Sequence, residues 1–373
     1  MRHVVLLKSR SGNHGGLEKY ASRIAKAFIE RGARVTILTT GESVRADVPL
    51  YSIKTIPWPA FLRMEQFDWF VRNWLKKNKA DLVFGMDRNR CQTHIRAGNG
   101  VHAAYLESRV LTEGRLKALF CKLNPLHRKI LALEKCAFEN PNLQKLFTNS
   151  HMVREQVLNH YKVDPAKIQV IHNGVEWNEM ETDFSQWPKG RAAGFRKFNL
   201  APHHFHFLFI GNGYLRKGLD RLLIGLSKLT RRDFHLSVIG KDNQMDLYRA
   251  KAVQLGLKDH VHFFGPSHEI RLFYQLADCL VIPSFYDPFA NVTVEALAMG
   301  LFVVSSKNNG GHEILTPDNG TVIDDLLSVD AMVNALEIAL AHGKTQNSAR
   351  LIRESVKHLD FSNQLRTLMD SCG

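Results

Sequence analysis

Two acidic residues, Asp287 and Glu295, are separated by seven residues in a segment whose groups suit a nucleotide sugar. A predicted strand ends at Pro283, and Asp287 follows it in a loop. Glu295 lies just inside a predicted helix that begins near Asn291. Two carboxylates so placed can accept hydrogen bonds from vicinal hydroxyls, one pair on a sugar and one on a ribose, and the helix N-terminus offers N–H groups to a phosphate. On the residues alone, Asp287 as a helix cap and Glu295 as an ordinary exposed acid remain the alternative.

A pair of cations, Arg216 and Lys217, follows another predicted strand in a loop that contains Gly211, Gly213 and Gly218. Cations at the end of a strand can neutralise a departing diphosphate, and each charge-assisted hydrogen bond contributes about 1.5–3 kcal/mol. The alternative is a solvated basic loop, which the flanking glycines make less favoured. On the residues alone, a diphosphate site and a solvated loop both remain possible for this pair.

A glycine-rich turn, residues 11–17, stands between the first predicted strand and the first predicted helix. Such a turn lets backbone N–H groups approach a phosphate at the helix N-terminus. The spacing is not that of a dinucleotide fingerprint, and no acidic residue clearly ends the second strand. Contact with a ligand and a purely structural tight turn therefore stay open at this point.

The elements that position these residues alternate between short apolar strands and amphipathic helices, which predicts parallel sheets with right-handed crossovers. We expect a first helix at residues 17–31, closed by Gly32, and a polar, irregular linker at residues 177–200. The last helix is expected at residues 351–369. The expected strands are residues 3–8, 34–39, 81–85, 145–148 and 168–171, and then 206–210, 235–239, 261–264, 279–283, 302–306 and 321–323.

This pattern predicts an α/β protein of two Rossmann-like, doubly wound domains that face a cleft. The expected limits are residues 1–173 for an acceptor-binding domain and 174–350 for a nucleotide-sugar-binding domain, with a C-terminal helix in 351–373 that could return to the first. A chain of 373 residues with 45% apolar and 23% charged residues can form two such cores.

Composition narrows the cellular setting. The five cysteines are scattered and lack metal-ligand spacing, which is typical of reduced thiols. The sequence contains no run of 18 apolar residues, so it predicts no membrane-spanning helix. We expect a cytoplasmic protein without a secretion signal. The net charge of +14 favours an anionic partner, which could be a phosphorylated substrate, a membrane surface or nucleic acid.

Taken together, the motifs resemble those of the family 4 retaining glycosyltransferases with the GT-B fold, in particular the lipopolysaccharide core glucosyltransferases. The resemblance runs through nearly the whole chain in the same order and spacing. The matching segments are residues 15–18, 96–102, 148–150, 168–175, 216–218 and 287–295.

The resemblance implies a role for each matching residue. Asp287 would contact the hydroxyls of the donor sugar and Glu295 the ribose, while Arg216 and Lys217 would hold the diphosphate. His102 is similar to a histidine that reaches the donor sugar, so the implied catalytic set is His102, Arg216, Lys217 and Asp287. Further donor contacts are implied for Gly15 and Gly16 and for the backbone amides of Phe289, Ala290 and Asn291.

The same resemblance implies transfer with retention, without a metal ion, a cofactor or an enzymic nucleophile. Three residues depart from the family pattern: Asp287 replaces the usual Glu, Ala290 replaces the usual Gly, and Asn99 stands where Asp is common. Asn99 is the candidate residue on the acceptor side. Because of these departures, the resemblance specifies the class of reaction better than it specifies the sugar that is transferred.

A basic amphipathic segment, residues 105–138, is typical of a peripheral contact with an anionic membrane, although a core helix with a charged face gives the same pattern. An aromatic cluster precedes three lysines and consists of Trp58, Phe61, Phe67, Trp69, Phe70 and Trp74. Packing of these rings against the first sheet is favoured over their contact with an acceptor or a lipid. No nucleic-acid module is recognisable, so nucleic acid is not an expected partner.

The resulting hypothesis is a hexosyltransferase on the cytoplasmic face of the inner membrane. It moves glucose from a UDP-glucose donor to a glycolipid acceptor, the heptose of the lipopolysaccharide core. The alternatives are another nucleotide sugar with a soluble or different lipid acceptor, a GT-B epimerase or phosphorylase, and a module that binds a nucleotide sugar or nucleic acid without turnover. A phosphorylase would require pyridoxal phosphate.

Overall fold

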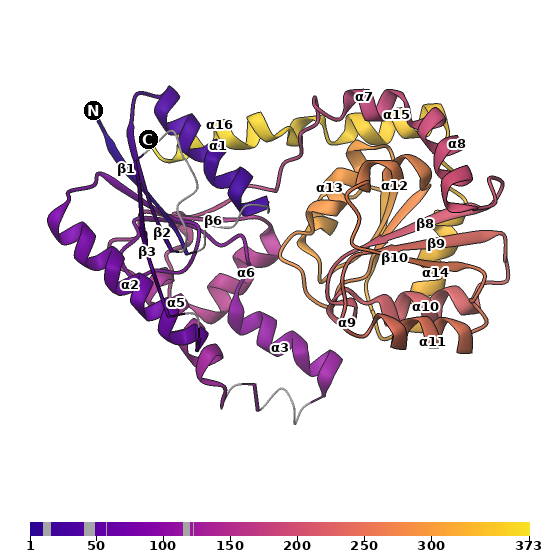
Figure 1. Ribbon diagram of the computed structural model, residues 1–373, viewed down its shortest axis with the longest axis horizontal. Helices are drawn as coiled ribbons and strands as arrows, with labels where there is room; N and C mark the ends of the chain where they lie inside the picture. Colours follow the sequence, from indigo (N-terminus) through magenta and orange to yellow (C-terminus); the bar gives the residue numbers. More distant parts are fainter. Residues whose placement is uncertain (10–15, 41–48, 57, 115–119, 122) are drawn as a thin grey trace. The chain divides into compact units, whose positions relative to one another are not determined.

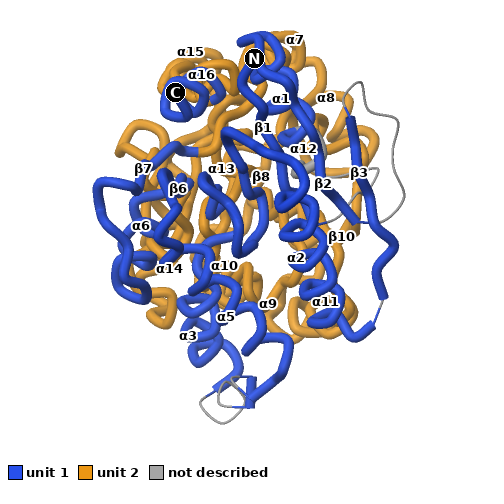
Figure 2. The backbone as a smooth tube through the Cα atoms, turned by 90° about the vertical axis from the view of Figure 1, so that its left-hand side faces the viewer, with its two compact units in different colours: residues 1–172, 365–373 blue, residues 173–364 orange. Residues whose placement is uncertain are grey.

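The computed structural model describes residues 1–9, 16–40, 49–56, 58–114, 120–121 and 123–373 (Figure 1). The chain forms two compact units, which are coloured separately in Figure 2. The first contains Met1–His172 and Leu365–Gly373, and the second contains Asn173–Gln364. Each unit is described by itself.

The first unit is built on a sheet of seven parallel strands in the order β3-β2-β1-β4-β5-β6-β7. Strand β1 is buried throughout, as its apolar sequence predicts. The strands are β1 His3–Lys8, β2 Arg34–Thr40, β3 Leu50–Ile53, β4 Leu82–Gly85, β5 His94–Arg96, β6 Lys145–Thr148 and β7 Ile168–Val170. Its helices are α1 Gly16–Glu30, α2 Ala60–Lys77, α3 His102–Glu113, α5 Pro125–Phe138 and α6 His151–His160.

The second unit contains six parallel strands in the order β10-β9-β8-β11-β12-β13, with helices on both faces (Figure 1). The strands are β8 Phe205–Ile210, β9 Phe234–Ile239, β10 Val261–Gly265, β11 Cys279–Ile282, β12 Phe302–Ser306 and β13 Gly320–Ile323. The helices are α7 Glu181–Ser185, α8 Trp187–Phe198, α9 Tyr214–Lys217, α10 Leu219–Lys228, α11 Met245–Gln254, α12 Ile270–Leu276, α13 Asn291–Ala298, α14 Val329–Leu340 and α15 Gln346–Ser355.

Both units confirm the doubly wound α/β architecture expected from the sequence. In the first sheet the strand order reverses between β1 and β4, and in the second it reverses between β8 and β11. The loops after two such neighbouring strands diverge to opposite faces, which opens a crevice at the carboxyl ends where ligands bind in this fold class. The two reversal points therefore locate the candidate sites.

Several local expectations were wrong. Strands β3 and β5 were not predicted, because four and three residues are too few to show a period. Residues 177–200 are not an irregular linker, since α7 and α8 occupy most of them and Phe195 of α8 is buried. The single last helix is divided into α15 and α16, Phe361–Ser371, by a short 3₁₀ turn, Lys357–Leu359.

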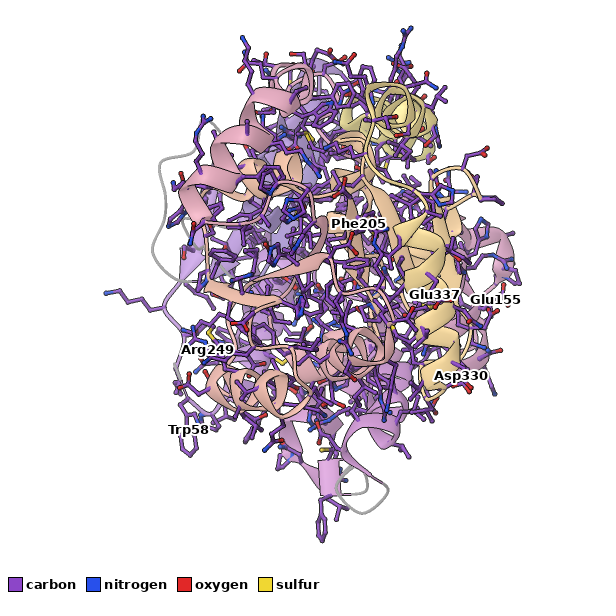
Figure 3. All side chains as sticks on the ribbon, turned by 90° about the vertical axis from the view of Figure 1, so that its right-hand side faces the viewer. Trp58, Glu155, Phe205, Arg249, Asp330 and Glu337 are labelled. Carbon is purple, nitrogen blue, oxygen red and sulfur yellow. The ribbon has the colours of Figure 1, made fainter. Side chains whose placement is uncertain are left out.

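The aromatic cluster at residues 58–74 is divided between the core and the surface. Phe67 is buried in a core with Val5 and Leu38, against which Phe70 and Trp74 also pack. Trp58 and Trp69 are instead 79% and 61% exposed, and Figure 3 shows the Trp58 side chain directed away from the ribbon. No described helix combines the length and the apolar character needed to cross a bilayer.

Candidate active site

The cation pair and the first acid meet at the reversal point of the second sheet. Arg216 and Lys217 lie in α9, directly after β8, and Asp287 lies in the loop after β11, the strand that pairs with β8. The backbone N–H of Phe285 donates to the carbonyl of Arg216 at 2.8 Å, which joins the two loops. Residues 70 positions apart in the sequence are thereby held in contact.

Helix α9 is a single turn between Gly213 and Gly218, both in the left-handed region with φ of 73° and 77°. A Cβ atom at Gly218 would lie 1.9 Å from the carbonyl oxygen of Pro283, so no other residue fits there. The buried Tyr214 fixes the turn, because its N–H donates to Asp242 at 2.6 Å and its hydroxyl to the carbonyl of Gly240 at 3.0 Å. The glycines thus allow Lys217 to approach β11 closely.

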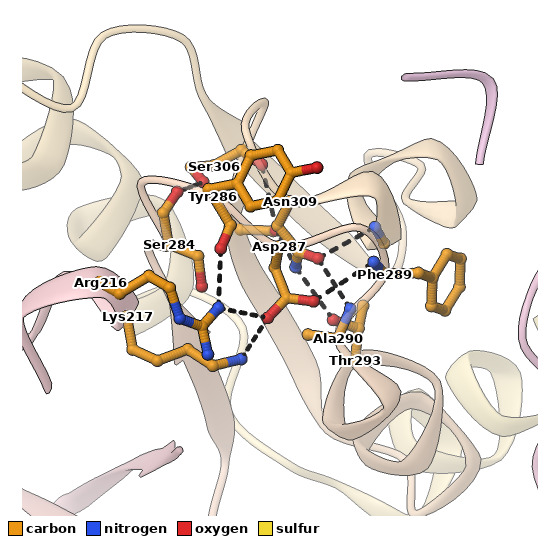
Figure 4. A network of polar contacts seen from close by, with 12 residues as sticks. Arg216, Lys217, Ser284, Tyr286, Asp287, Phe289, Ala290, Thr293, Ser306 and Asn309 are labelled. Atoms are coloured by element: carbon orange, nitrogen blue, oxygen red, sulfur yellow. Dashed lines mark hydrogen bonds and ion pairs between the residues drawn. The ribbon is translucent and has the colours of Figure 1, made fainter. Parts of the chain in front are cut away.

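The carboxylate of Asp287 is buried and paired with both cations (Figure 4). Its Oδ2 atom lies 2.5 Å from Nζ of Lys217 and 3.2 Å from a guanidinium nitrogen of Arg216. The same guanidinium nitrogen donates to the carbonyl of Tyr286 at 2.8 Å. Two positive charges face one negative charge, so this cluster keeps a net attraction for a further anion.

Asn309 holds the loop that carries Asp287. Its Oδ1 accepts the N–H groups of Ala290 at 2.9 Å and Gly311 at 3.1 Å. Its Nδ2 donates to Ser305 at 2.9 Å and Thr293 at 3.3 Å, which completes the hydrogen bonds that an amide side chain can make (Figure 4). The side chain is fully buried. Asn309 therefore fixes the start of α13 relative to β12.

The start of α13 presents amide groups next to this cluster. Ala290 precedes the helix, and its N–H is taken by Asn309, while the N–H of Phe289 donates to Oδ1 of Asp287 at 3.3 Å. Helix geometry leaves the N–H groups of Asn291 and Val292 without an intrahelical acceptor. Of the three amides implied by the sequence resemblance, Asn291 is thus the one best placed to meet a phosphate.

The second acid, Glu295, is half-buried on α13 and accepts the hydroxyl of Tyr274 at 2.7 Å. Tyr274 lies in α12 and is buried, and burial followed by the Glu295 charge raises the pKa of its phenol well above 10. The tyrosine therefore stays a hydrogen-bond donor at every physiological pH. It aims the Glu295 carboxylate and stabilises its charge.

In the first unit, His102 is the first residue of α3, and the buried carboxylate of Glu134 caps that helix. Glu134 also accepts Nε of Arg88 at 2.6 Å and the hydroxyl of Tyr161 at 2.6 Å. Burial, with a smaller contribution from the charge of Arg88, lowers the pKa of His102 to about 4. The imidazole is therefore neutral near pH 7, and its Nε2 lies 3.0 Å from Nδ1 of His127.

The exposed Asn99 lies between β5 and α3, in a loop fixed by a hydrogen bond from Asn149 to the carbonyl of Gly98 at 3.1 Å. A pocket opens beside it, at the carboxyl ends of β4 and β5. Its lining consists of Met86, Asp87, Arg88, Ile95, Arg96, Ala97, Asn99, Gly100 and Phe138. Gly16 begins α1, whereas Gly15 lies outside the described residues.

Sequence reasoning missed Asn309, Tyr274 and Glu134. Asn309 stands before Gly310-Gly311 at the end of a strand, a pattern that indicates a tight turn but not a buried network. Glu134 lies in a helix rich in basic residues, where an acid predicts a surface ion pair. Tyr274 has no local signal, because its partner is 21 positions away.

Two family models match the chain, each over one of its halves. Residues 14–178 match "Glycosyltransferase Family 4", and residues 191–358 match "Glycosyl transferases group 1". The lipopolysaccharide glucosyltransferase WaaG of Escherichia coli K12 is 26% identical over 364 residues, which cover 95% of this chain and 93% of WaaG.

The fold is likewise similar to solved structures. The crystal structure of WaaG superposes with a TM-score of 0.76 and 24% identity over 99% of this chain and 98% of its own. The structure of Anabaena HepE in complex with UDP-glucose gives a TM-score of 0.68 and 17% identity over 100% and 99% of the two chains. At these identities the likeness establishes the GT-B fold.

Proposed function

Because the chain belongs to the glycosyltransferases that join a family 4 domain to a group 1 domain, we propose that it transfers a hexose from a nucleotide sugar to a lipid-linked glycan. The donor we propose is UDP-glucose, and the acceptor is the heptose of a lipopolysaccharide core. WaaG, a relative of this chain, is named a lipopolysaccharide glucosyltransferase. HepE, which shares the fold, was solved with UDP-glucose.

The observation that carries the proposal is the cluster of Arg216, Lys217 and Asp287 at the reversal point of the second sheet. Two cations and the N-terminus of α13 would stabilise the negative charge that builds up on a departing nucleoside diphosphate. Asp287 would accept sugar hydroxyls and Glu295 the ribose hydroxyls. These charges supply what a metal ion supplies elsewhere, so we propose a metal-independent reaction without a cofactor. We propose retention because the sequence resembles the family 4 retaining glycosyltransferases.

His102, neutral near pH 7, would hydrogen-bond the donor sugar, and the exposed Asn99 would contact the acceptor. A neutral imidazole can donate through one nitrogen and accept through the other, which suits an uncharged hydroxyl.

The experiment is an assay of UDP-, GDP- and ADP-sugars with a heptose-containing acceptor, with and without EDTA. We expect transfer from UDP-glucose, an α-linked product from the α-linked donor by NMR, and rates unchanged by EDTA. Loss of activity in EDTA would refute the metal-free reaction, and a β-linked product would refute retention. Binding of UDP-glucose without turnover on any acceptor would favour the binding module.

We also propose that the protein acts at the cytoplasmic face of the inner membrane. Apolar side chains are exposed where α3 ends and α5 begins: Leu111 is 48%, Phe120 71% and Leu123 63% exposed. Arg128 and Lys135 are exposed on the same α5. Apolar groups at a basic surface bind anionic leaflets, with each cation contributing about 1 kcal/mol.

This membrane contact predicts that the triple variant L111S/F120S/L123S loses most of its co-flotation with anionic vesicles. The variant L351S is the control, because Leu351 is equally exposed, at 63%, but lies on α15 in the second unit. Equal flotation of the two variants would contradict the assignment of the contact to α3 and α5.

A further inference from the structure

The carboxylate of Asp287 occupies the position beside Arg216 and Lys217 that an anionic ligand of these two cations would take. One oxygen, Oδ2, receives both Nζ of Lys217 at 2.5 Å and the guanidinium of Arg216 at 3.2 Å. The other oxygen accepts the N–H of Phe289 at 3.3 Å. The side chains of Lys217 and Asp287 are only 10% and 11% exposed, so this ion pair is shielded from water.

A phosphate oxygen and this carboxylate oxygen compete for the same donors. The ammonium group of Lys217 has three hydrogens, but two anionic oxygens held beside it at a buried position repel each other strongly. A diphosphate that takes Lys217 and Arg216 therefore draws them away from Asp287. The carboxylate is then buried with one weak backbone donor, a state that is costly unless new donors arrive.

A sugar attached to the diphosphate brings such donors. Two vicinal hydroxyl groups can both donate to one carboxylate, and this would restore the hydrogen bonds that Asp287 loses. A nucleoside diphosphate without a sugar displaces the carboxylate and offers nothing in return. The site would thus distinguish a nucleotide sugar from a bare nucleoside diphosphate by the hydroxyl groups of the sugar rather than by the size of the ligand.

We propose that Asp287 is a built-in competitor of the diphosphate, and that it makes the site prefer a nucleotide sugar to the bare nucleoside diphosphate. On donor binding, Arg216 and Lys217 pass from Asp287 to the phosphates, and Asp287 passes to the sugar hydroxyls. After transfer the sugar leaves, Asp287 recovers its two cations, and the hold on the product weakens. This inference rests on the proposed function, because it assigns the donor to the cluster of Arg216, Lys217 and Asp287.

The first test uses the unaltered protein and isothermal titration with UDP, free glucose and UDP-glucose. Glucose at saturation should tighten the binding of UDP by roughly tenfold, since it supplies the donors that Asp287 has lost. Independent binding of UDP and glucose would overturn the inference. Because no variant is involved, a folding defect cannot obscure this result.

The second test is D287N, which removes the negative charge and leaves the size of the side chain. UDP and inorganic pyrophosphate should bind roughly tenfold more tightly to D287N than to the unaltered protein, while turnover falls and the effect of glucose disappears. The control is D233N: Asp233 is paired with Arg231 at 2.5 Å at the amino end of β9, so the same charge is removed away from the carboxyl ends of the strands.

The outcomes separate this inference from the function it rests on. If the protein binds no nucleotide at all, the proposed donor site is wrong, and the inference is overturned with it. If it binds and transfers UDP-glucose but D287N binds UDP no more tightly than D233N does, the function stands and the competitor is refuted.

Discussion

Asn309 accepts the backbone N–H of Ala290 at 2.9 Å through its side-chain oxygen, across a separation of 19 residues in the chain. This single contact joins the turn after β12 to the start of α13, beside the loop of Asp287. The amide nitrogen of Asn309 then reaches Thr293 and Ser305. The loop that carries the first acid is therefore fixed by a residue that need not touch a ligand.

The first prediction concerns N309A. Removal of the amide leaves several buried polar groups without partners, and we expect the free energy of unfolding to fall by roughly 2–4 kcal/mol in a urea titration. Where the variant is still folded, donor affinity should fall at least about tenfold, because Asp287 and α13 lose their support.

A matched control for this variant is N319A. Asn319 is also buried, accepts the N–H of Thr316 at 2.8 Å and donates to Ser355 at 3.0 Å, but it lies before β13. Its loss should lower stability to a similar extent and leave donor affinity unchanged. Equal donor affinity in the two folded variants would show that Asn309 has only a structural role.

The second prediction concerns K217A. The ammonium of Lys217 would stabilise charge that develops on the departing diphosphate, so we expect turnover to fall by roughly two orders of magnitude or more, with a smaller change in KM. Lys197, paired with Glu269 at 2.6 Å on the surface, provides the control variant K197A, which should turn over normally. Near-normal turnover of K217A, measured by release of UDP, would remove Lys217 from the reaction.

The third prediction concerns acid stability. Histidines gather at the amino ends of β8, β9 and β10, where the buried His235 lies 3.1 Å from His204 and 3.2 Å from His262, nitrogen to nitrogen. Burial, reinforced by the neighbouring imidazoles, lowers the pKa of His235 to about 3, and burial lowers the pKa of His206 to about 4. Both histidines are therefore neutral in the folded protein near pH 7.

The sign of the effect follows from the unfolded state. Unfolded histidines have a pKa near 6.5, so below that value the unfolded chain binds protons that these buried histidines do not. The contribution of these two histidines to the free energy of unfolding should be constant above pH 6.5. As the pH drops toward 4, it should fall by at most about 1.4 kcal/mol per pH unit for each histidine. H235Q should flatten this dependence in urea titrations, and H268Q, at an exposed position, should leave it unchanged. A parallel pH dependence in both variants would contradict the prediction.

The fourth prediction concerns Arg353, a buried cation on α15. Its guanidinium lies 4.0 Å over the ring of Trp177, donates to the Trp177 carbonyl at 2.6 Å, and donates to the carbonyl of Ala298 at the end of α13. R353M leaves both carbonyls without this donor, so we expect a loss of roughly 2–5 kcal/mol in the free energy of unfolding. R350M, at an exposed position on the same helix, should cost less than about 0.5 kcal/mol. A small effect of R353M would show that water can replace the guanidinium.

The sequence by itself determined the parts that depend on local pattern. Strands such as β1 and β12 are short, mostly apolar runs typical of a buried parallel sheet, and the order of the elements predicts two doubly wound sheets. The spacing of Asp287 and Glu295, one in a loop and one in a helix, was also readable, because it depends on where a strand ends and a helix begins.

Only the tertiary structure decided which distant groups meet. The pairing of Lys217 with Asp287 follows from the adjacency of β8 and β11, which are separated by two intervening strands in the chain. Phe195 of α8 is buried because α8 packs against α12, a contact that the irregular sequence of α8 does not predict. The supports of the site, Asn309, Tyr274 and Glu134, form hydrogen bonds with partners far along the chain. Such contacts depend on position in space, which sequence spacing alone does not specify.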